Sequence, residues 1–206
     1  MKICGIRTME EASAAFDLGA DAVGFNFWPK SPRYIEPDLA RRIVSKLSPL
    51  VSCIGVFVNE RPEKVLETAR VASLDGVQLH GDESAEYCSS LEGIRIIKAV
   101  RVTEGFDLSV LERFPVTAFL LDTYIKGEYG GTGRRFDWRL AAEAARRARI
   151  ILAGGLDAEN VGEAITTVRP FGVDVCSGVE SEPGRKDMES MKLFMQAVWL
   201  AQDERR

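Results

Sequence analysis

Short apolar runs alternate with amphipathic stretches along the whole chain, and this alternation predicts the fold. The apolar runs are rich in β-branched residues, stop at glycine or a polar residue, and have the length of strands buried on both faces. Between them, apolar residues recur at helical spacing, as at Val161, Ala164, Ile165 and Val168. The strands expected from this pattern cover residues 2–5, 22–27, 51–58, 77–80, 94–100, 116–121, 150–153 and 173–176.

The first helix shows how local signals support these assignments. Thr8 and Glu11 have the spacing of a capping box, and Gly19 is placed to end the helix. We expect this helix to bury Ala12, Ala15, Phe16 and Leu18. The next helix, opened by Pro37, is expected to bury Leu39, Ile43, Val44 and Leu47. A weak helix is expected at 108–113, and Asp137 is expected to cap a later one.

About eight strand and helix pairs in 206 residues suit the lower size limit of a (β/α)8 TIM barrel. A doubly wound open sheet would also alternate, but no G-x-G-x-x-G motif follows the first strand. No linker or composition break interrupts the series. We therefore predict an α/β fold in which residues 1–206 form a single (β/α)8 barrel domain.

The last two predicted strands both run into glycine. Gly154 and Gly155 follow the seventh strand, and Ser177 and Gly178 follow the eighth. In (β/α)8 barrels these two loops form the usual phosphate site, because backbone N–H groups and helix N-termini meet there. The four residues are therefore predicted to bind phosphate.

Other candidates for chemistry lie at the ends of predicted strands. Asp122 follows six apolar residues, where burial would raise its pKa and make it a general acid, although it could also cap a turn. Cys4 ends the first strand. It is a functional thiol if a nearby cation or helix N-terminus depresses its pKa, and a small buried residue otherwise. Arg33 lies in the loop after the second strand, where it is expected either to bind a carboxylate or to be a solvated loop residue. His80 ends the fourth strand and is expected to be either a catalytic residue or a polar residue at the barrel rim. Residues 130–133 are a lid or a flexible connection.

Composition narrows the function classes. The net charge of −4 argues against a nucleic-acid surface. Four widely spaced cysteines and one histidine make a metal site improbable, and Cys53 and Cys176 are expected to be buried within strands. No signal peptide or membrane-spanning run is present, so the expected location is cytoplasmic. Trp28 or Trp199, if exposed, would mark a dimer interface. The sequence leaves the oligomeric state open between a monomer and a homodimer.

Seven motifs in register resemble phosphoribosylanthranilate isomerase, a (β/α)8-barrel family of tryptophan biosynthesis. The resemblance runs in order over nearly the whole chain, and the seven motifs together are highly specific although each alone is weak. They lie at residues 2–6, 29–33, 76–81, 120–123, 130–133, 152–156 and 174–180.

The resemblance implies the Amadori rearrangement of N-(5'-phosphoribosyl)anthranilate to 1-(2-carboxyphenylamino)-1-deoxyribulose 5-phosphate, without a cofactor. Cys4 matches the family's general base and Asp122 its general acid. Arg33 matches the residue expected to hold the anthranilate carboxylate. His80 and Asp174 match polar residues that line the family's pocket. The family's phosphate site matches Gly154, Gly155, Ser177 and Gly178.

Three alternatives remain open at this stage. A ribulose-phosphate epimerase would need several metal-ligating histidines, and His80 is the only histidine. An indole-glycerol-phosphate synthase would need a catalytic lysine and glutamate, for which Lys98 is the one candidate lysine. A phosphosugar-binding protein without catalysis would not need both Cys4 and Asp122.

Overall fold

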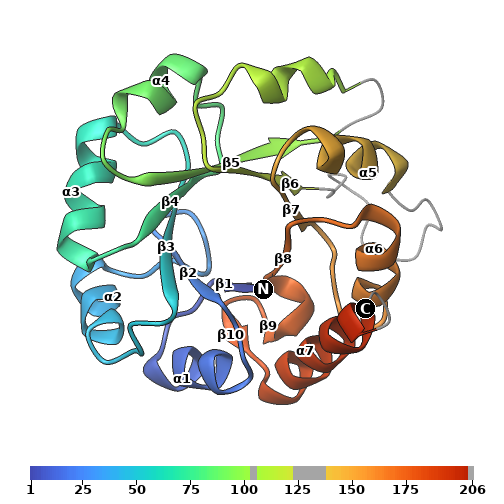
Figure 1. The fold of residues 1–206 in the computed structure, drawn as a ribbon. Helices are drawn as coiled ribbons and strands as arrows, with labels where there is room; N and C mark the ends of the chain where they lie inside the picture. The colour runs from blue at the N-terminus through green and yellow to red at the C-terminus, as the bar shows by residue number, and fades with distance from the viewer. Residues whose placement is uncertain (103–105, 123–137, 204–206) are drawn as a thin grey trace.

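The central feature of the computed structural model, which describes residues 1–102, 106–122 and 138–203, is a closed barrel of parallel strands (Figure 1). The strands follow one another in chain order, and the barrel closes where Lys2 on the first strand pairs with Asp174 on the eighth. The strands are β1 (Lys2–Cys4), β2 (Ala22–Asn26), β3 (Ser52–Phe57), β4 (Gly76–Leu79), β5 (Arg95–Arg101), β6 (Ala118–Asp122), β7 (Ile150–Ala153) and β8 (Gly172–Val175). The predicted (β/α)8 barrel is confirmed, and the open sheet is excluded.

A ring of helices surrounds the barrel, and each strand is followed by one of them (Figure 1). The last helix contacts both the first helix and its predecessor, so the two ends of the chain close the outer ring. The helices are α1 (Met9–Asp17), α2 (Pro37–Val44), α3 (Pro62–Ala72), α4 (Ala85–Ser90), the 3₁₀ helix η1 (Leu108–Glu112), α5 (Trp138–Arg147), α6 (Val161–Val168) and α7 (Met188–Asp203).

The helix ends follow the local signals closely, and the buried faces follow them less well. Thr8 and Glu11 form the predicted capping box, and Gly19 has a φ of +83°. Phe16 and Leu39, however, are 37% and 40% exposed, so the prediction that they are buried is wrong. Both lie beside their helix's buried positions, which are Ala12 and Ala15 in α1 and Ala40 and Ile43 in α2.

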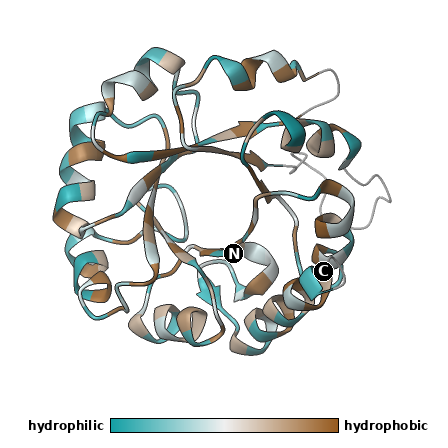
Figure 2. Ribbon diagram, in the orientation of Figure 1, coloured by the Kyte–Doolittle hydropathy of each residue, from teal (hydrophilic) through white to brown (hydrophobic). Residues whose placement is uncertain are grey.

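Most apolar side chains fill the layer between sheet and helices, and a smaller cluster of Ala99, Leu120 and Ala153 lies inside the barrel. In Figure 2 the strands are largely brown, whereas the helices carry both brown and teal residues. The barrel interior also holds buried polar residues, among them Lys2, Gln78 and Asp174. Gln78 and Asp174 line the site described below, and Lys2 is ion-paired to Asp174.

A small antiparallel pair after β8 was not predicted. The 3₁₀ turn η2 (Ser177–Val179) leads into β9 (Glu180–Glu182), which pairs with β10 (Arg185–Lys186) across a turn at Gly184. Residues 130–133 and Asp137, for which a lid and a helix cap were expected, lie outside the described residues. No helix in the described part of the chain is long and apolar enough to cross a membrane.

Candidate functional site

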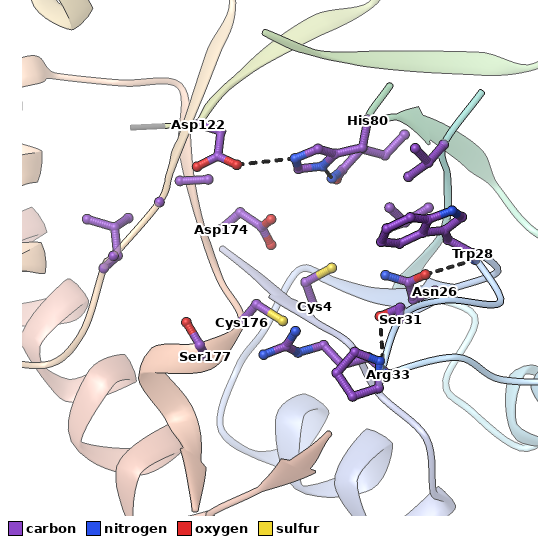
Figure 3. A pocket seen from close by; sticks show the side chains of 18 of the residues that line it. Cys4, Asn26, Trp28, Ser31, Arg33, His80, Asp122, Asp174, Cys176 and Ser177 are labelled. Carbon is purple, nitrogen blue, oxygen red and sulfur yellow. Dashed lines mark hydrogen bonds and ion pairs between the residues drawn. The ribbon is translucent and has the colours of Figure 1, made fainter. Parts of the chain in front are cut away.

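One cavity of about 380 Å³ opens at the carboxyl ends of the barrel strands and gathers most of the predicted site residues. Figure 3 shows Asp122 and His80 on one side of it, Cys4, Cys176 and Arg33 on the other, and Asp174 between them. Gly178 does not line the cavity. It lies just behind, where a Cβ would be 1.9 Å from the carbonyl oxygen of Leu156. The predicted residues that line the cavity are Cys4, Arg33, His80, Asp122, Gly154, Gly155, Asp174 and Ser177.

Cys4 stands beside a buried ion pair that joins the first and last strands. Lys2 Nζ lies 2.9 Å from Asp174 Oδ1, and both side chains are less than 10% exposed. The absence of a side chain at Gly24 makes room for this arrangement. A Cβ there would be 2.8 Å from Cys4 Sγ and 3.1 Å from Lys2 Nζ.

The surroundings of Cys4 favour the thiolate. A hydrogen bond from the Cys176 thiol is the main cause of a pKa well below the usual range for Cys4, and the charges of Lys2 and Lys186 act in the same direction against burial. Burial raises the pKa of Asp174 to about 6, although Lys2 opposes this. The strand ends therefore place the Cys4 thiol beside a lysine that is shared with a carboxylate, surroundings that favour its ionised form.

Replacing Lys2 tests this description of the thiolate. In Lys2→Met the pKa of Cys4 is expected to rise, because the larger of the two lysine charges that lower it is gone. The pH dependence of ultraviolet thiolate absorbance measures it. Unfolding free energy is expected to fall by about 3–5 kcal/mol, because Asp174 is left buried without its partner. Lys30→Ala removes an exposed lysine and serves as the control. A Cys4 titration that is identical in Lys2→Met and wild type would contradict the assignment.

Asp122 takes part in a chain of polar side chains across the cavity. His80 Nε2 lies 3.2 Å from Asp122 Oδ2, and His80 Nδ1 lies 2.9 Å from Gln78 Nε2. In this arrangement the Gln78 amide donates to Nδ1, so the imidazole carries its proton on Nε2 and donates to the carboxylate. The Asp122 side chain is 22% exposed, which places it at the rim of the barrel interior.

The orientation of the Gln78 amide matters for the protonation of Asp122. Gln78 is 1% exposed, and its Oε1 accepts no hydrogen bond from the described part of the chain. Turning the amide by half a turn would let Oε1 accept from His80 Nδ1–H. His80 Nε2 would then accept from a protonated Asp122. The chain of side chains is thus compatible with both protonation states of the carboxyl group.

Arg33 is fixed by a buried carboxylate on the unpredicted hairpin. Its Nε and Nη2 lie 2.8 and 2.6 Å from the two oxygens of Glu180, and Lys186 Nζ is 2.8 Å from Glu180 Oε1. Although burial acts to raise it, these hydrogen bonds hold the pKa of Glu180 below its usual range. The fork uses Nε and Nη2 and leaves Arg33 Nη1 directed away from Glu180.

The residues predicted to bind phosphate lie where β7 and β8 end. Gly154 and Gly155 turn the chain with φ values of +83° and +65°, a conformation that side chains rarely adopt. Ser177 opens the short turn η2 after β8. The close approach of Gly178 to Leu156 joins the two loops, so a side chain at 178 would push them apart.

Two sequence interpretations need correction or extension. Cys176 is not buried within a strand, because β8 ends at Val175 and the Cys176 thiol lines the cavity half-buried. Lys2, Gln78 and Lys186 were not singled out as site residues. The sequence did contain a signal for two of these residues. Gln78 is a polar residue inside an otherwise apolar strand. Lys2 lies two residues before Cys4, so its side chain is on the same face of the strand.

Lys98, the lysine considered for a synthase, lies outside the main cavity. Its Nζ is 2.8 Å from Glu83 Oε2 and 2.7 Å from the carbonyl oxygen of Gly81, and both charged groups are buried. It therefore supports the loop after β4. Within residues 1–102, 106–122 and 138–203 no group of three or more His, Cys, Asp and Glu is arranged to hold a metal ion.

Comparison with known proteins gives a consistent result. The family model described as N-(5'phosphoribosyl)anthranilate (PRA) isomerase matches residues 1–197. The N-(5'-phosphoribosyl)anthranilate isomerase of Geobacter sp. (strain M21) is 49% identical over 195 residues, 95% of each chain. The crystal structure of the Thermotoga maritima enzyme is similar with a TM-score of 0.85 and 49% identity, covering 96% of this chain and 97% of that one. Another similar structure is an isomerase in complex with reduced 1-(o-carboxyphenylamino)-1-deoxyribulose 5-phosphate, with a TM-score of 0.83, 47% identity, and coverage of 96% and 97%.

Proposed function

The chain belongs to the N-(5'-phosphoribosyl)anthranilate isomerase family of tryptophan biosynthesis, and from this premise we propose how its residues perform the isomerisation. Residues 1–206 act as one catalytic barrel domain, with Asp122 as general acid and Cys4 as general base. The observation that carries the proposal is that both side chains line one cavity, on β6 and β1, three strands apart around the barrel. A substrate between them would meet a proton donor and an acceptor at once.

Each proton has a definite origin and destination in this reaction. Asp122 protonates the furanose ring oxygen of N-(5'-phosphoribosyl)anthranilate, and the C1'–O bond breaks to give a protonated imine. The Cys4 thiolate then removes the proton from C2', which gives an enolamine. The enolamine tautomerises to the ketone 1-(2-carboxyphenylamino)-1-deoxyribulose 5-phosphate. The protonated imine is itself the electron sink, so the proposed reaction needs no cofactor.

The substrate is held at its two anionic ends. We assign the phosphate to Gly154, Gly155, Ser177 and Gly178, where two strand ends meet. The anthranilate carboxylate is assigned to Arg33. His80 and Asp174 line the space between the two ends. The related isomerase in complex with a reduced product analogue supports a phosphosugar ligand of this size.

Arg33→Ala is expected to raise KM by about tenfold or more with little change in kcat. A charge-assisted hydrogen bond contributes about 1.5–3 kcal/mol, and a contact made equally in ground and transition states affects binding alone. Steady-state kinetics at saturating and limiting substrate measure both constants.

Lys30→Ala, an exposed cation in the same loop, is the matched control and should leave both constants unchanged. Glu180 keeps its ion pair with Lys186 in Arg33→Ala, so the barrel should still fold. A fall in kcat with unchanged KM would contradict a carboxylate-binding role for Arg33.

The direct test of the proposed function is the change in anthranilate-type fluorescence when the purified protein meets freshly generated phosphoribosylanthranilate. Wild-type protein should consume the substrate rapidly. Tight binding of a phosphorylated product analogue without turnover would instead indicate a phosphosugar-binding protein. Turnover only of another phosphorylated aldose would indicate a different phosphosugar isomerase.

The proposed function also predicts the binding partner and the location of the protein. We propose that it binds a small phosphosugar and neither nucleic acid nor a membrane. We propose a cytoplasmic location. A similar Thermotoga maritima structure is described as a monomer generated from a dimeric isomerase. A monomer and a homodimer are both consistent with this relative. Trp28 lines the cavity, so Trp199 on α7 is the more suitable of the two tryptophans to mark an interface.

A further inference from the structure

The site holds a second thiol for which the isomerisation has no direct use. Cys176 lines the same cavity as Cys4, and Figure 3 shows both sulfur atoms directed into it. We propose that Cys4 and Cys176 form a reversible disulfide when the protein meets a small hydroperoxide, which makes the pair an oxidative modification site. The consequence for turnover rests on the proposed role of Cys4, but formation of the bond does not.

Strand register places the two cysteines opposite one another. Lys2 pairs with Asp174 and Ile3 with Val175, so one step further along each chain brings Cys4 beside Cys176. Neighbouring strands lie about 4.8 Å apart, which is within the Cα separation that a disulfide spans. Lys2 and Asp174 already contact each other on this face, and Figure 3 shows the sulfurs of Cys4 and Cys176, two residues on, both directed into the cavity.

Two glycines leave room for the sulfurs on this face. A Cβ at Gly5 would lie 3.1 Å from Cys176 Sγ, and one at Gly24 would lie 2.8 Å from Cys4 Sγ, so the sulfurs occupy space that side chains at these positions would take. Each thiol is also the largest influence on the pKa of the other, downward for Cys4 and upward for Cys176. Because both sulfurs face one cavity from the ends of paired strands, bond formation needs no large rearrangement of the barrel.

The surroundings of Cys4 favour oxidation there over the other cysteines. Lys186 Nζ lies 3.7 Å from Cys176 Sγ, and Lys2 is close to Cys4, so cations face both sulfurs. The hydrogen bond to Cys4 and burial nevertheless raise the pKa of Cys176, so Cys4 is the thiol that meets the oxidant and Cys176 is the one that reacts second. Burial raises the pKa of Cys53 to about 12 and also raises the pKa of Cys88. Since the thiolate is the reactive form, Cys53 and Cys88 serve as unreactive controls within the same molecule.

The chemistry balances with the hydroperoxide as the only oxidant. With hydrogen peroxide, the Cys4 thiolate attacks one peroxide oxygen, the O–O bond breaks, and hydroxide leaves and is protonated to water. Cys4 is then a sulfenic acid. The Cys176 sulfur attacks the Cys4 sulfur, its proton leaves, and a second water departs as the disulfide forms. Two thiols are oxidised by two electrons, and a dithiol reverses the step.

The experiment treats the full-length protein with hydrogen peroxide and follows intact mass, peptide maps without reductant, and isomerase activity before and after dithiothreitol. The expected product has lost two hydrogens and yields one cross-linked peptide that joins Cys4 to Cys176. Activity should fall nearly to zero and return fully with the dithiol. Cys176→Ser is expected to lose activity without a cross-link, to give a sulfenic acid at Cys4, and to recover progressively less as that acid is oxidised further.

Each activity is compared with that of the same protein in its reduced form, because Cys176→Ser also alters the hydrogen bond to Cys4. Further oxidation of Cys4 in wild type while Cys176 stays reduced would overturn the proposal. A cross-link through Cys53 or Cys88 would overturn it equally. The mass readout needs no turnover, so a cross-link in a protein that does not isomerise the substrate would refute the proposed function alone.

Discussion

Asp122→Asn is expected to lower kcat by about 10²–10⁴-fold while the barrel still folds. An amide has the shape of a carboxylic acid but cannot give up a proton to the furanose oxygen at a useful rate. The substituted side chain can still accept the hydrogen bond from His80 Nε2, which lies 3.2 Å from Asp122 Oδ2. Loss of the proton donor should therefore appear in kcat, with KM nearly unchanged.

The measurement is single-turnover fluorescence with enzyme in excess, which separates the chemical step from product release. Asp38→Asn removes an exposed carboxyl on α2 and should behave as wild type. Thermal unfolding of both variants checks that the fold is intact. Turnover of a folded Asp122→Asn variant within a few-fold of wild type would show that another group protonates the ring oxygen.

The sequence predicted best those site residues whose position depends on a local pattern. The residue that ends a buried strand can be read from the run before it, which is why Cys4, His80 and Asp122 were placed at the cavity correctly. A closed barrel then brings all strand ends to one rim, so positions far apart in the chain converge. Closure follows from the number of repeating units, and the structure confirms it.

Contacts between residues that are far apart in the chain, which form only when the barrel closes, could not be predicted from local patterns. Lys2 acquires its partner Asp174 only because β1 pairs with β8, at a separation of 172 residues. Arg33 is fixed by Glu180, which reaches it because a short hairpin folds back after β8. A Pro-Gly pair at 183–184 was a turn signal for that hairpin. Its strands are too short to give an alternating pattern.

Cys4→Ser is expected to lower kcat by about 10²–10⁴-fold, because the hydroxyl group does not ionise near neutral pH and so cannot remove the C2' proton. Serine is close to cysteine in size and should leave the contacts over Gly24 and with Lys2 in place. Deuterium at C2' of the substrate provides a direct readout. A primary isotope effect should be larger in the variant, where proton removal limits the rate.

The pH dependence of wild-type kcat/KM gives an independent check on the same thiolate. Falling pH protonates Cys4, so activity should be lost on the acid side, below the value of about 8.5 at which an ordinary cysteine titrates. The hydrogen bond from Cys176 and the charges of Lys2 and Lys186 lower the pKa of Cys4, so this acid limb lies at lower pH than in a protein without them. Lys2→Met should move the limb to higher pH, whereas Cys53→Ala should not move it. If the limb stays in place in Lys2→Met, the titrating base is a group other than Cys4, and the large loss expected in Cys4→Ser would need another cause.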